Sequence, residues 1–119
     1  MNTIIREKGF TLVELLVTMG IIAILAAIAI PNFISFRQRG YYAAQTTDAK
    51  NAYTAAQNFF NDYPINDITD LNELKDFGYV QTNEIIMSIA DGSQNSLELI
   101  ISHNQSNRTY TMHQDGNLE

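Results

Sequence analysis

The first third of the chain is dominated by an almost unbroken apolar stretch from Phe10 to Ile30. At ~1.5 Å per residue, this stretch would form a helix roughly 31 Å long, which matches a bilayer core of about 30 Å. Glu14 is the one charged residue inside it. The pattern predicts a helix that can span a membrane, either as a permanent anchor or as a segment that later packs among other helices.

Beyond this stretch, apolar and small residues recur at intervals of three and four, which is typical of an amphipathic helix. The residues on this face are Ala49, Ala52, Tyr53, Ala56, Phe59 and Phe60. We therefore expect one helix over 10–61, apolar all round in its first half and one-sided in its second. Pro64 ends it, because the residue before a proline disfavours helix. Gly20 and Pro31 should weaken its middle, since glycine lowers helix propensity and proline removes a backbone donor.

The segment after Pro64 predicts a short second helix. Asp70, with Glu73 three residues later, has the spacing of an N-terminal capping box. Leu71, Leu74 and Phe77 form an apolar stripe, and Gly78 can close the C-terminus.

Three strands are expected in the remaining chain, over 84–90, 96–102 and 109–114, where apolar and polar residues alternate. Asp91-Gly92 is a turn signal between the first two strands, and 104–107 is turn-prone between the last two. The predicted fold class is α+β: a long N-terminal α-helix, hydrophobic in its first half and amphipathic in its second, packed on a small three-stranded antiparallel sheet.

The 119 residues include no cysteine and carry a net charge of −6. Without cysteines, no disulfide can reinforce the small core, so we expect modest stability for the isolated subunit. An acidic chain also lacks the clustered cations that broad electrostatic binding of nucleic acid requires, so there is no strong nucleic-acid signal.

The start of the chain has the pattern of an export signal. Arg6 and Lys8 precede the apolar stretch, as in signals whose basic end stays inside the cell. The run Lys8-Gly9-Phe10-Thr11-Leu12-Val13-Glu14-Leu15, followed by Ile30-Pro31-Asn32-Phe33, resembles the prepilin signal of type IV pilins and of type II secretion pseudopilins. The resemblance implies a leader peptide over 1–9, a hydrophobic transmembrane or filament-core helix over 10–36, and a globular pilin domain over 37–119.

The resemblance also implies processing at the junction of Gly9 and Phe10. A prepilin peptidase would cut after Gly9 and methylate the new amine of Phe10. Glycine leaves the backbone at the cut open to a peptidase, because it has no side chain. The alternative is that 1–9 is simply a disordered terminus.

Glu14 is the predicted assembly and registry residue. A lone carboxylate in a membrane-length helix marks a functional site by default. The amine of processed Phe10 is costly to bury alone, and Glu14 of a neighbouring subunit can neutralise it, which would fix the stagger between subunits. The alternative is a carboxylate that only reaches the headgroup region.

No catalytic or cofactor signature stands out, so the chain is not expected to be an enzyme, and no cofactor or metal is expected. His103 and His113 are interpreted as polar strand residues, because no cysteine or tight acidic group accompanies them. Acids at positions 67, 70, 73 and 76 are expected to cap and solvate the short helix, with a calcium site as the weaker alternative.

The resemblance implies a structural subunit of a type IV pilus serving adhesion, twitching motility or DNA uptake. It would be polymerised as a homo-oligomer from the inner membrane by an assembly platform and an ATPase motor. It would lie in the inner membrane first and then in the pilus at the cell surface. One alternative is a pseudopilin of a periplasmic type II secretion pseudopilus. Another alternative is an electron-conducting filament, suggested by the aromatic residues Phe10, Phe33, Phe36, Tyr41 and Phe60. The other interpretation of these residues is ordinary packing at subunit interfaces.

Overall fold

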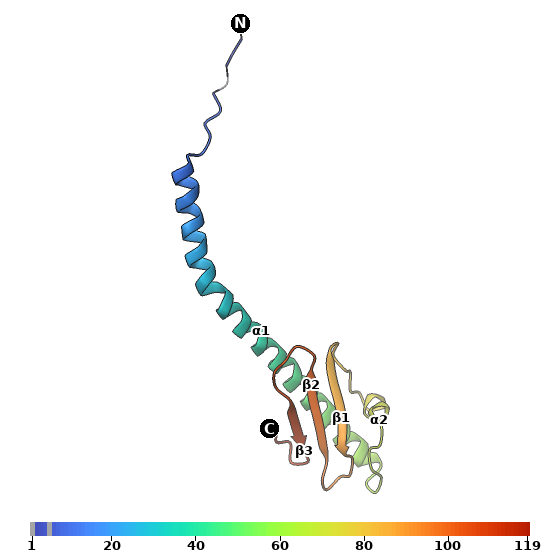
Figure 1. Cartoon of the computed structure of the whole chain (residues 1–119). Coiled ribbons are helices and arrows are strands. Elements are labelled where there is room, and N and C mark those ends of the chain that lie inside the picture. The colour runs from blue at the N-terminus through green and yellow to red at the C-terminus, as the bar shows by residue number, and fades with distance from the viewer. Residues whose placement is uncertain (1, 5) are drawn as a thin grey trace. The chain divides into compact units, whose positions relative to one another are not determined.

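The computed structural model describes residues 2–4 and 6–119. The elements follow in the order α1 (Leu12–Asp62), α2 (Leu71–Asp76), β1 (Ile85–Asp91), β2 (Glu98–His103) and β3 (Tyr110–His113) (Figure 1). The chain divides into two units, one up to Ser35 and the other Phe36–Glu119. The predicted α+β class is confirmed.

The first unit contains the apolar half of α1, and none of its described residues is buried. Nearly every side chain from Leu12 to Ser35 is exposed, and none of its most apolar stretch is buried. α1 is the one helix of the described residues that is long and apolar enough to cross a membrane. Its helical assignment continues through Gly20 and Pro31, so the weakness predicted for these two positions remains a prediction.

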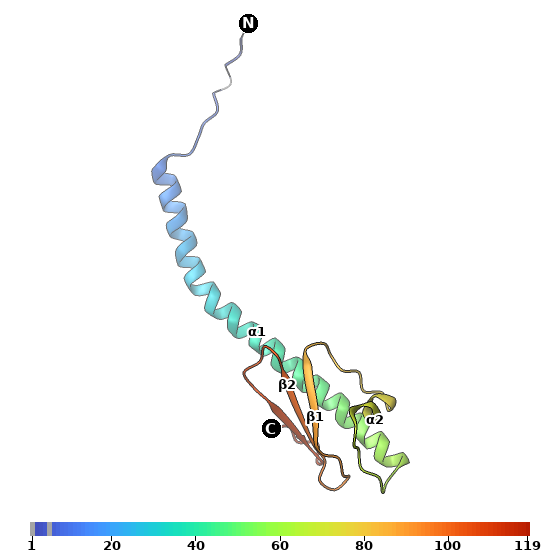
Figure 2. The ribbon, with the colours of Figure 1, turned by 45° about the vertical axis from the view of Figure 1, so that its right-hand side comes forward.

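The second unit carries the hydrophobic core. The sheet lies across the second half of α1 in both views (Figures 1 and 2). The helix contributes small alanines and two phenylalanines, and the sheet contributes branched residues, Met87 and Met112. The apolar residues with 2% exposure or less are Ala49, Ala52, Ala55, Ala56, Phe60, Ile68, Leu74, Tyr79, Leu97, Leu99, Ile101 and Met112. The alanines and phenylalanines lie on the one-sided face of α1 that the amphipathic pattern predicts.

The sheet is antiparallel throughout, in the order β1-β2-β3. Backbone hydrogen bonds between Thr111 and Glu119 add the end of the chain to the outer edge of β3. The predicted strands exist, but each is shifted or shortened. β1 ends at Asp91, one residue beyond the predicted end, and the predicted turn follows as a loop over 92–97 that leads to β2. A bulge between Ile89 and Asp91 shifts the pairing by one residue.

α2 begins and ends as predicted, but its capping differs in one partner. The Asp70 carboxylate accepts a hydrogen bond from the Asn72 N–H (3.2 Å). Glu73 does not bond back to the backbone of Asp70; its carboxylate accepts from the Thr69 N–H (3.2 Å) and hydroxyl (2.9 Å). At the other end, Gly78 has φ +99°, a conformation that glycine adopts without steric cost.

A polar cluster fastens the loop between β2 and β3 to α1. Tyr41 donates to the Gln105 side chain, Tyr42 to that of Asn107, and Gln45 to the Arg108 carbonyl (2.8 Å). The Tyr41 ring also stacks on His103, with centroids 4.4 Å apart. His103 is therefore a buried residue at the end of β2, 8% exposed, with Glu84 3.6 Å from its Nε2.

Candidate processing and assembly site

The predicted cleavage position lies in a segment without regular structure. Residues 6–11 belong to no helix or strand, and all are exposed. Phe10 is 92% exposed. A Cβ built on Gly9 would meet no atom within 4 Å. The peptide bond between Gly9 and Phe10 is thus open on all sides, which is the condition a peptidase requires.

α1 starts at Leu12 rather than at Phe10, because Thr11 and Glu14 form a capping box. The Glu14 carboxylate accepts from the Thr11 N–H (2.9 Å), and the Glu14 N–H donates to the Thr11 hydroxyl (3.2 Å). These reciprocal bonds satisfy two backbone donors that a helix N-terminus otherwise leaves without partners. The predicted start at Phe10 is therefore two residues early.

This capping box gives Glu14 a local partner that the sequence interpretation overlooked. The signal was present, since Thr11-Leu12-Val13-Glu14 fits the Ser/Thr-x-x-Glu pattern. In the single chain, the carboxylate stabilises the start of its own helix, where negative charge also complements the helix dipole. Its role in subunit registry stays a prediction.

The five aromatic residues singled out by the sequence do not come together. In the described part of the chain, no two of them form a ring pair with each other. Phe60 is a core residue, 2% exposed, and Tyr41 stacks on His103. Phe10, Phe33 and Phe36 are exposed. Two of the five thus have a packing role inside the subunit, and conduction stays a prediction.

Asp48 is a buried acid that sequence reasoning did not single out. It is 1% exposed, and its carboxylate accepts from the Tyr79 hydroxyl (3.1 Å), the Thr82 N–H (2.9 Å) and the Thr82 hydroxyl. Burial and the neighbouring Asp48 carboxylate raise the pKa of Tyr79 well above its ordinary value. The network holds the segment before β1 on α1, so we assign it a structural role.

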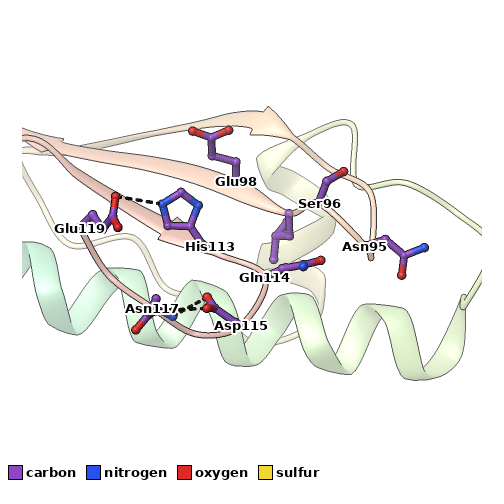
Figure 3. Close-up of a pocket in the computed structure, with 9 residues that line it drawn as sticks. Asn95, Ser96, Glu98, His113, Gln114, Asp115, Asn117 and Glu119 are labelled. Atoms are coloured by element: carbon purple, nitrogen blue, oxygen red, sulfur yellow. Dashed lines mark hydrogen bonds and ion pairs between the residues drawn. The ribbon is translucent and has the colours of Figure 1, made fainter.

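A polar pocket opens beside β3 and the chain end (Figure 3). It has a volume of about 500 Å³, and Ser96, Glu98, Asp115 and Asn117 are among its lining residues. Figure 3 shows the His113 imidazole and the Glu119 carboxylate facing one another. The distance from His113 Nε2 to Glu119 Oε2 is 3.7 Å. Within the described residues, no group of three or more His, Cys, Asp and Glu side chains could hold a metal ion.

We compared the sequence with protein-family models and with known proteins, and the matches are to one class of protein. A model of the prokaryotic N-terminal methylation motif matches residues 4–30. The type IV wide pilus major component PilA4 of Thermus thermophilus is 37% identical over 102 residues, which cover 82% of this chain and 75% of that protein.

Two further relatives match about half of this chain. The type IV major pilin protein PilA of Myxococcus xanthus is 51% identical over 57 residues, which are 48% of this chain and 26% of that protein. The type IV narrow pilus major component PilA5 of Thermus thermophilus is 39% identical over 70 residues, covering 47% of this chain and 60% of that protein. The chain therefore matches only about a quarter of the Myxococcus relative.

The fold and these similarities define a structural filament subunit. The chain belongs to the type IV pilins.

Proposed function

We propose that this chain is made as a precursor, loses residues 1–9 to a prepilin peptidase, is methylated on Phe10 and polymerises into a long pilus at the cell surface. The observation that carries the proposal is the N-terminal unit itself. An exposed Gly9-Phe10 junction is followed by an apolar helix that buries none of its most hydrophobic stretch within the subunit. Such a surface requires either lipid or neighbouring subunits around it.

The membrane is the first environment of this helix, and the filament is the second. Before assembly, the basic leader stays on the cytoplasmic side and α1 spans the inner membrane. An assembly platform driven by an ATPase then transfers the helix into a homo-oligomeric filament. A long pilus, rather than a short secretion pseudopilus, is supported by relatives that are pilus components by name. Adhesion, twitching motility and DNA uptake are the roles we propose for it.

Within this scheme, Glu14 changes partners. In the single chain its carboxylate caps α1 through Thr11. Removal of the leader creates the Phe10 amine, a cation that is costly to bury without a counter-charge. In the filament, Glu14 of one subunit neutralises this amine on the next, and the neutral Thr11 hydroxyl remains to cap the helix. The exchange sets the register because only one stagger places amine and carboxylate together.

The test separates capping from charge. Glutamine satisfies the capping-box pattern as glutamate does, so Glu14→Gln keeps the helix start but removes the negative charge. We expect Glu14→Gln and Glu14→Ala to insert in the membrane normally and to lower the yield of sheared surface filaments at least about tenfold, since an unpaired buried cation is strongly disfavoured. Electron microscopy and immunoblotting of the sheared fraction would measure the yield.

Thr11→Ala is the matched control, because it removes the hydroxyl of the capping box and leaves the charge of Glu14. It should reduce filament yield less than Glu14→Gln does. Normal yield from Glu14→Gln would show that capping is sufficient and would contradict the charge exchange. A wild-type chain that forms no surface filament in its own cell would contradict the proposed function as a whole.

A further inference from the structure

The charged groups of the subunit are almost entirely without intramolecular partners of opposite sign. The sequence has 7 Lys and Arg residues against 13 Asp and Glu residues. Over residues 2–4 and 6–119, the basic and acidic side chains within 4.0 Å of each other are His103 with Glu84 and His113 with Glu119, and both pairs involve a histidine. No lysine or arginine in that part of the chain lies within 4.0 Å of a carboxylate. The cations of this acidic chain are therefore available to other copies of it.

One cleft has the chemistry to receive such a cation. It has a volume of about 280 Å³ and lies where the end of α1 meets α2. Three aromatic residues line it. Between ring centroids, Phe59 lies 5.4 Å from Tyr63 and 5.6 Å from Phe77, and Tyr63 lies 6.2 Å from Phe77. Tyr63 is 48% exposed, so this aromatic surface is open to solvent.

Acidic residues also line this cleft. Asp67, Glu73 and Asp76 all line it. Glu73 accepts hydrogen bonds from Thr69. Asp67 and Asp76 are exposed and accept no side-chain hydrogen bond from residues 2–4 or 6–119. Aromatic faces beside carboxylates form a receptor for a guanidinium, which stacks on rings and donates to carboxylates at the same time.

Among the arginines of the second unit, Arg37 is the one with no contact to an aromatic ring of its own chain. The Arg39 guanidinium lies 5.7 Å from the Phe36 ring centroid, and the Arg108 guanidinium lies 4.8 Å from that of Tyr42. Arg37 is exposed and forms neither an ion pair nor a ring contact within the described residues. Its guanidinium therefore remains available both to pair with a carboxylate and to stack on an aromatic ring.

We propose that this aromatic cleft binds the guanidinium of Arg37 from a second copy of the chain, as a contact between subunits of the filament. Arg37 and Phe59 both belong to α1, and a separation of 22 positions corresponds to about 33 Å along a helix. The contact thus joins copies displaced by roughly that distance along α1. This inference rests on the proposed function, because it requires the chain to polymerise.

Cysteine cross-linking tests the contact directly, since the chain contains no native cysteine. Arg37→Cys and Asp76→Cys would be combined in the full-length chain and expressed in the native host. Sheared filaments would then be treated with a short bismaleimide, because an arginine side chain spans more than the ~7 Å that a disulfide allows between Cα atoms. We expect a ladder of covalent dimers and higher multimers on a denaturing gel.

Two matched pairs serve as controls. Arg37→Cys with Asp115→Cys keeps the same cation position but uses an exposed acid outside the cleft, and it should give no ladder. Lys50→Cys with Asp76→Cys tests another exposed cation of α1. A ladder from the Lys50 pair without one from the Arg37 pair would overturn the assignment of Arg37. Intact filaments of the Arg37 pair that give no ladder would overturn the contact itself.

Co-expression keeps the test valid if the double variant assembles poorly. Chains carrying Arg37→Cys and chains carrying Asp76→Cys would each be diluted into wild-type filaments, and mixed dimers would appear only where both are present. Failure of wild-type filaments to form refutes the proposed function; wild-type filaments without mixed dimers refute only this contact.

Charge reversal provides a second readout. Arg37→Glu places an anion against the acidic residues that line the cleft, and we expect it to lower filament yield about fivefold, because like charges in a contact are unfavourable. Adding Asp76→Lys should restore the yield to within about twofold of wild type. Equal loss in the single and the double variant would contradict the pairing.

Discussion

The two units of this subunit use hydrophobic residues in opposite ways. From Leu12 to Ser35, large apolar side chains stand exposed along a single helix, for example Ile24 at 65% and Leu25 at 61% exposed. In Phe36–Glu119, leucines and isoleucines of the sheet are almost wholly buried, with Leu99 and Ile101 at 0%. The same residue types thus face outward in one unit and inward in the other.

This contrast separates assembly from folding. The second unit buries its apolar surface within one chain, so its stability depends on internal packing and hydrogen bonds. None of the described residues of the first unit is buried within the chain, and under the proposed function lipid or other subunits cover its apolar surface. Substitutions in the first unit should therefore change processing and filament yield, whereas those in the second should change the melting temperature of the subunit.

The largest expected effect concerns the leader junction. Gly9→Val places a branched side chain at the proposed cut, and we expect processed product to fall at least about tenfold, because the peptidase loses its open backbone. Intact mass spectrometry of the membrane fraction would show a precursor that keeps residues 1–9. Gly20→Val is the matched control, since a Cβ at Gly20 also meets nothing within 4 Å, and it should be processed normally. A methylated Phe10 terminus in Gly9→Val would contradict the role of Gly9.

A smaller effect is expected from substitution of Gly92 in the second unit, where it should lower the stability of the fold. A Cβ built there would lie 1.8 Å from the Ile68 carbonyl oxygen, and the Gly92 carbonyl accepts a 2.8 Å hydrogen bond from the Ile68 N–H. Gly92→Ala forces these two backbones apart, so we expect a loss of about 2 to 3 kcal/mol in the free energy of unfolding. Thermal unfolding of the detergent-solubilised subunit, followed by circular dichroism, would measure it.

Gly40→Ala provides the comparison for Gly92→Ala. A Cβ at Gly40 meets no atom within 4 Å, and replacing glycine by alanine inside a helix is favourable by up to ~1 kcal/mol. Equal melting temperatures for Gly92→Ala and Gly40→Ala would contradict the close approach at Ile68.

The smallest effect is a pH dependence carried by Tyr79. Its pKa is raised in the fold, first by burial and then by Asp48, whereas an unfolded tyrosine titrates near pH ~10. The unfolded chain therefore releases this proton first, so the stabilisation is present below about pH 10 and is lost as pH rises above it. Tyr79→Phe should make the fall in melting temperature above about pH 10 shallower. If the melting temperature of Tyr79→Phe fell as steeply as that of the wild type, groups other than Tyr79 would be responsible for the pH dependence.

Periodicity alone was sufficient for the architecture. The step from a continuous apolar stretch to a one-sided pattern predicted the two halves of α1, and alternation predicted the strands, because burial on one face imposes the period of the element. The Lys8–Leu15 motif indicated the family, which the relatives confirm. These are local signals, readable without knowing what lies nearby in space.

Contacts between distant segments were decided only by the tertiary structure. The bulge that moves Asp91 into β1, the burial of Asp48 beneath Tyr79 and Thr82, and the stacking of Tyr41 on His103 all join residues far apart in the chain or depend on strand register. The capping of Glu14 by Thr11 is different, since its pattern was local and was overlooked. The sequence by itself determined which residues are apolar and with what period. The tertiary structure decided which polar groups meet, because a hydrogen bond depends on distances of a few tenths of an ångström that no pattern of residue types encodes.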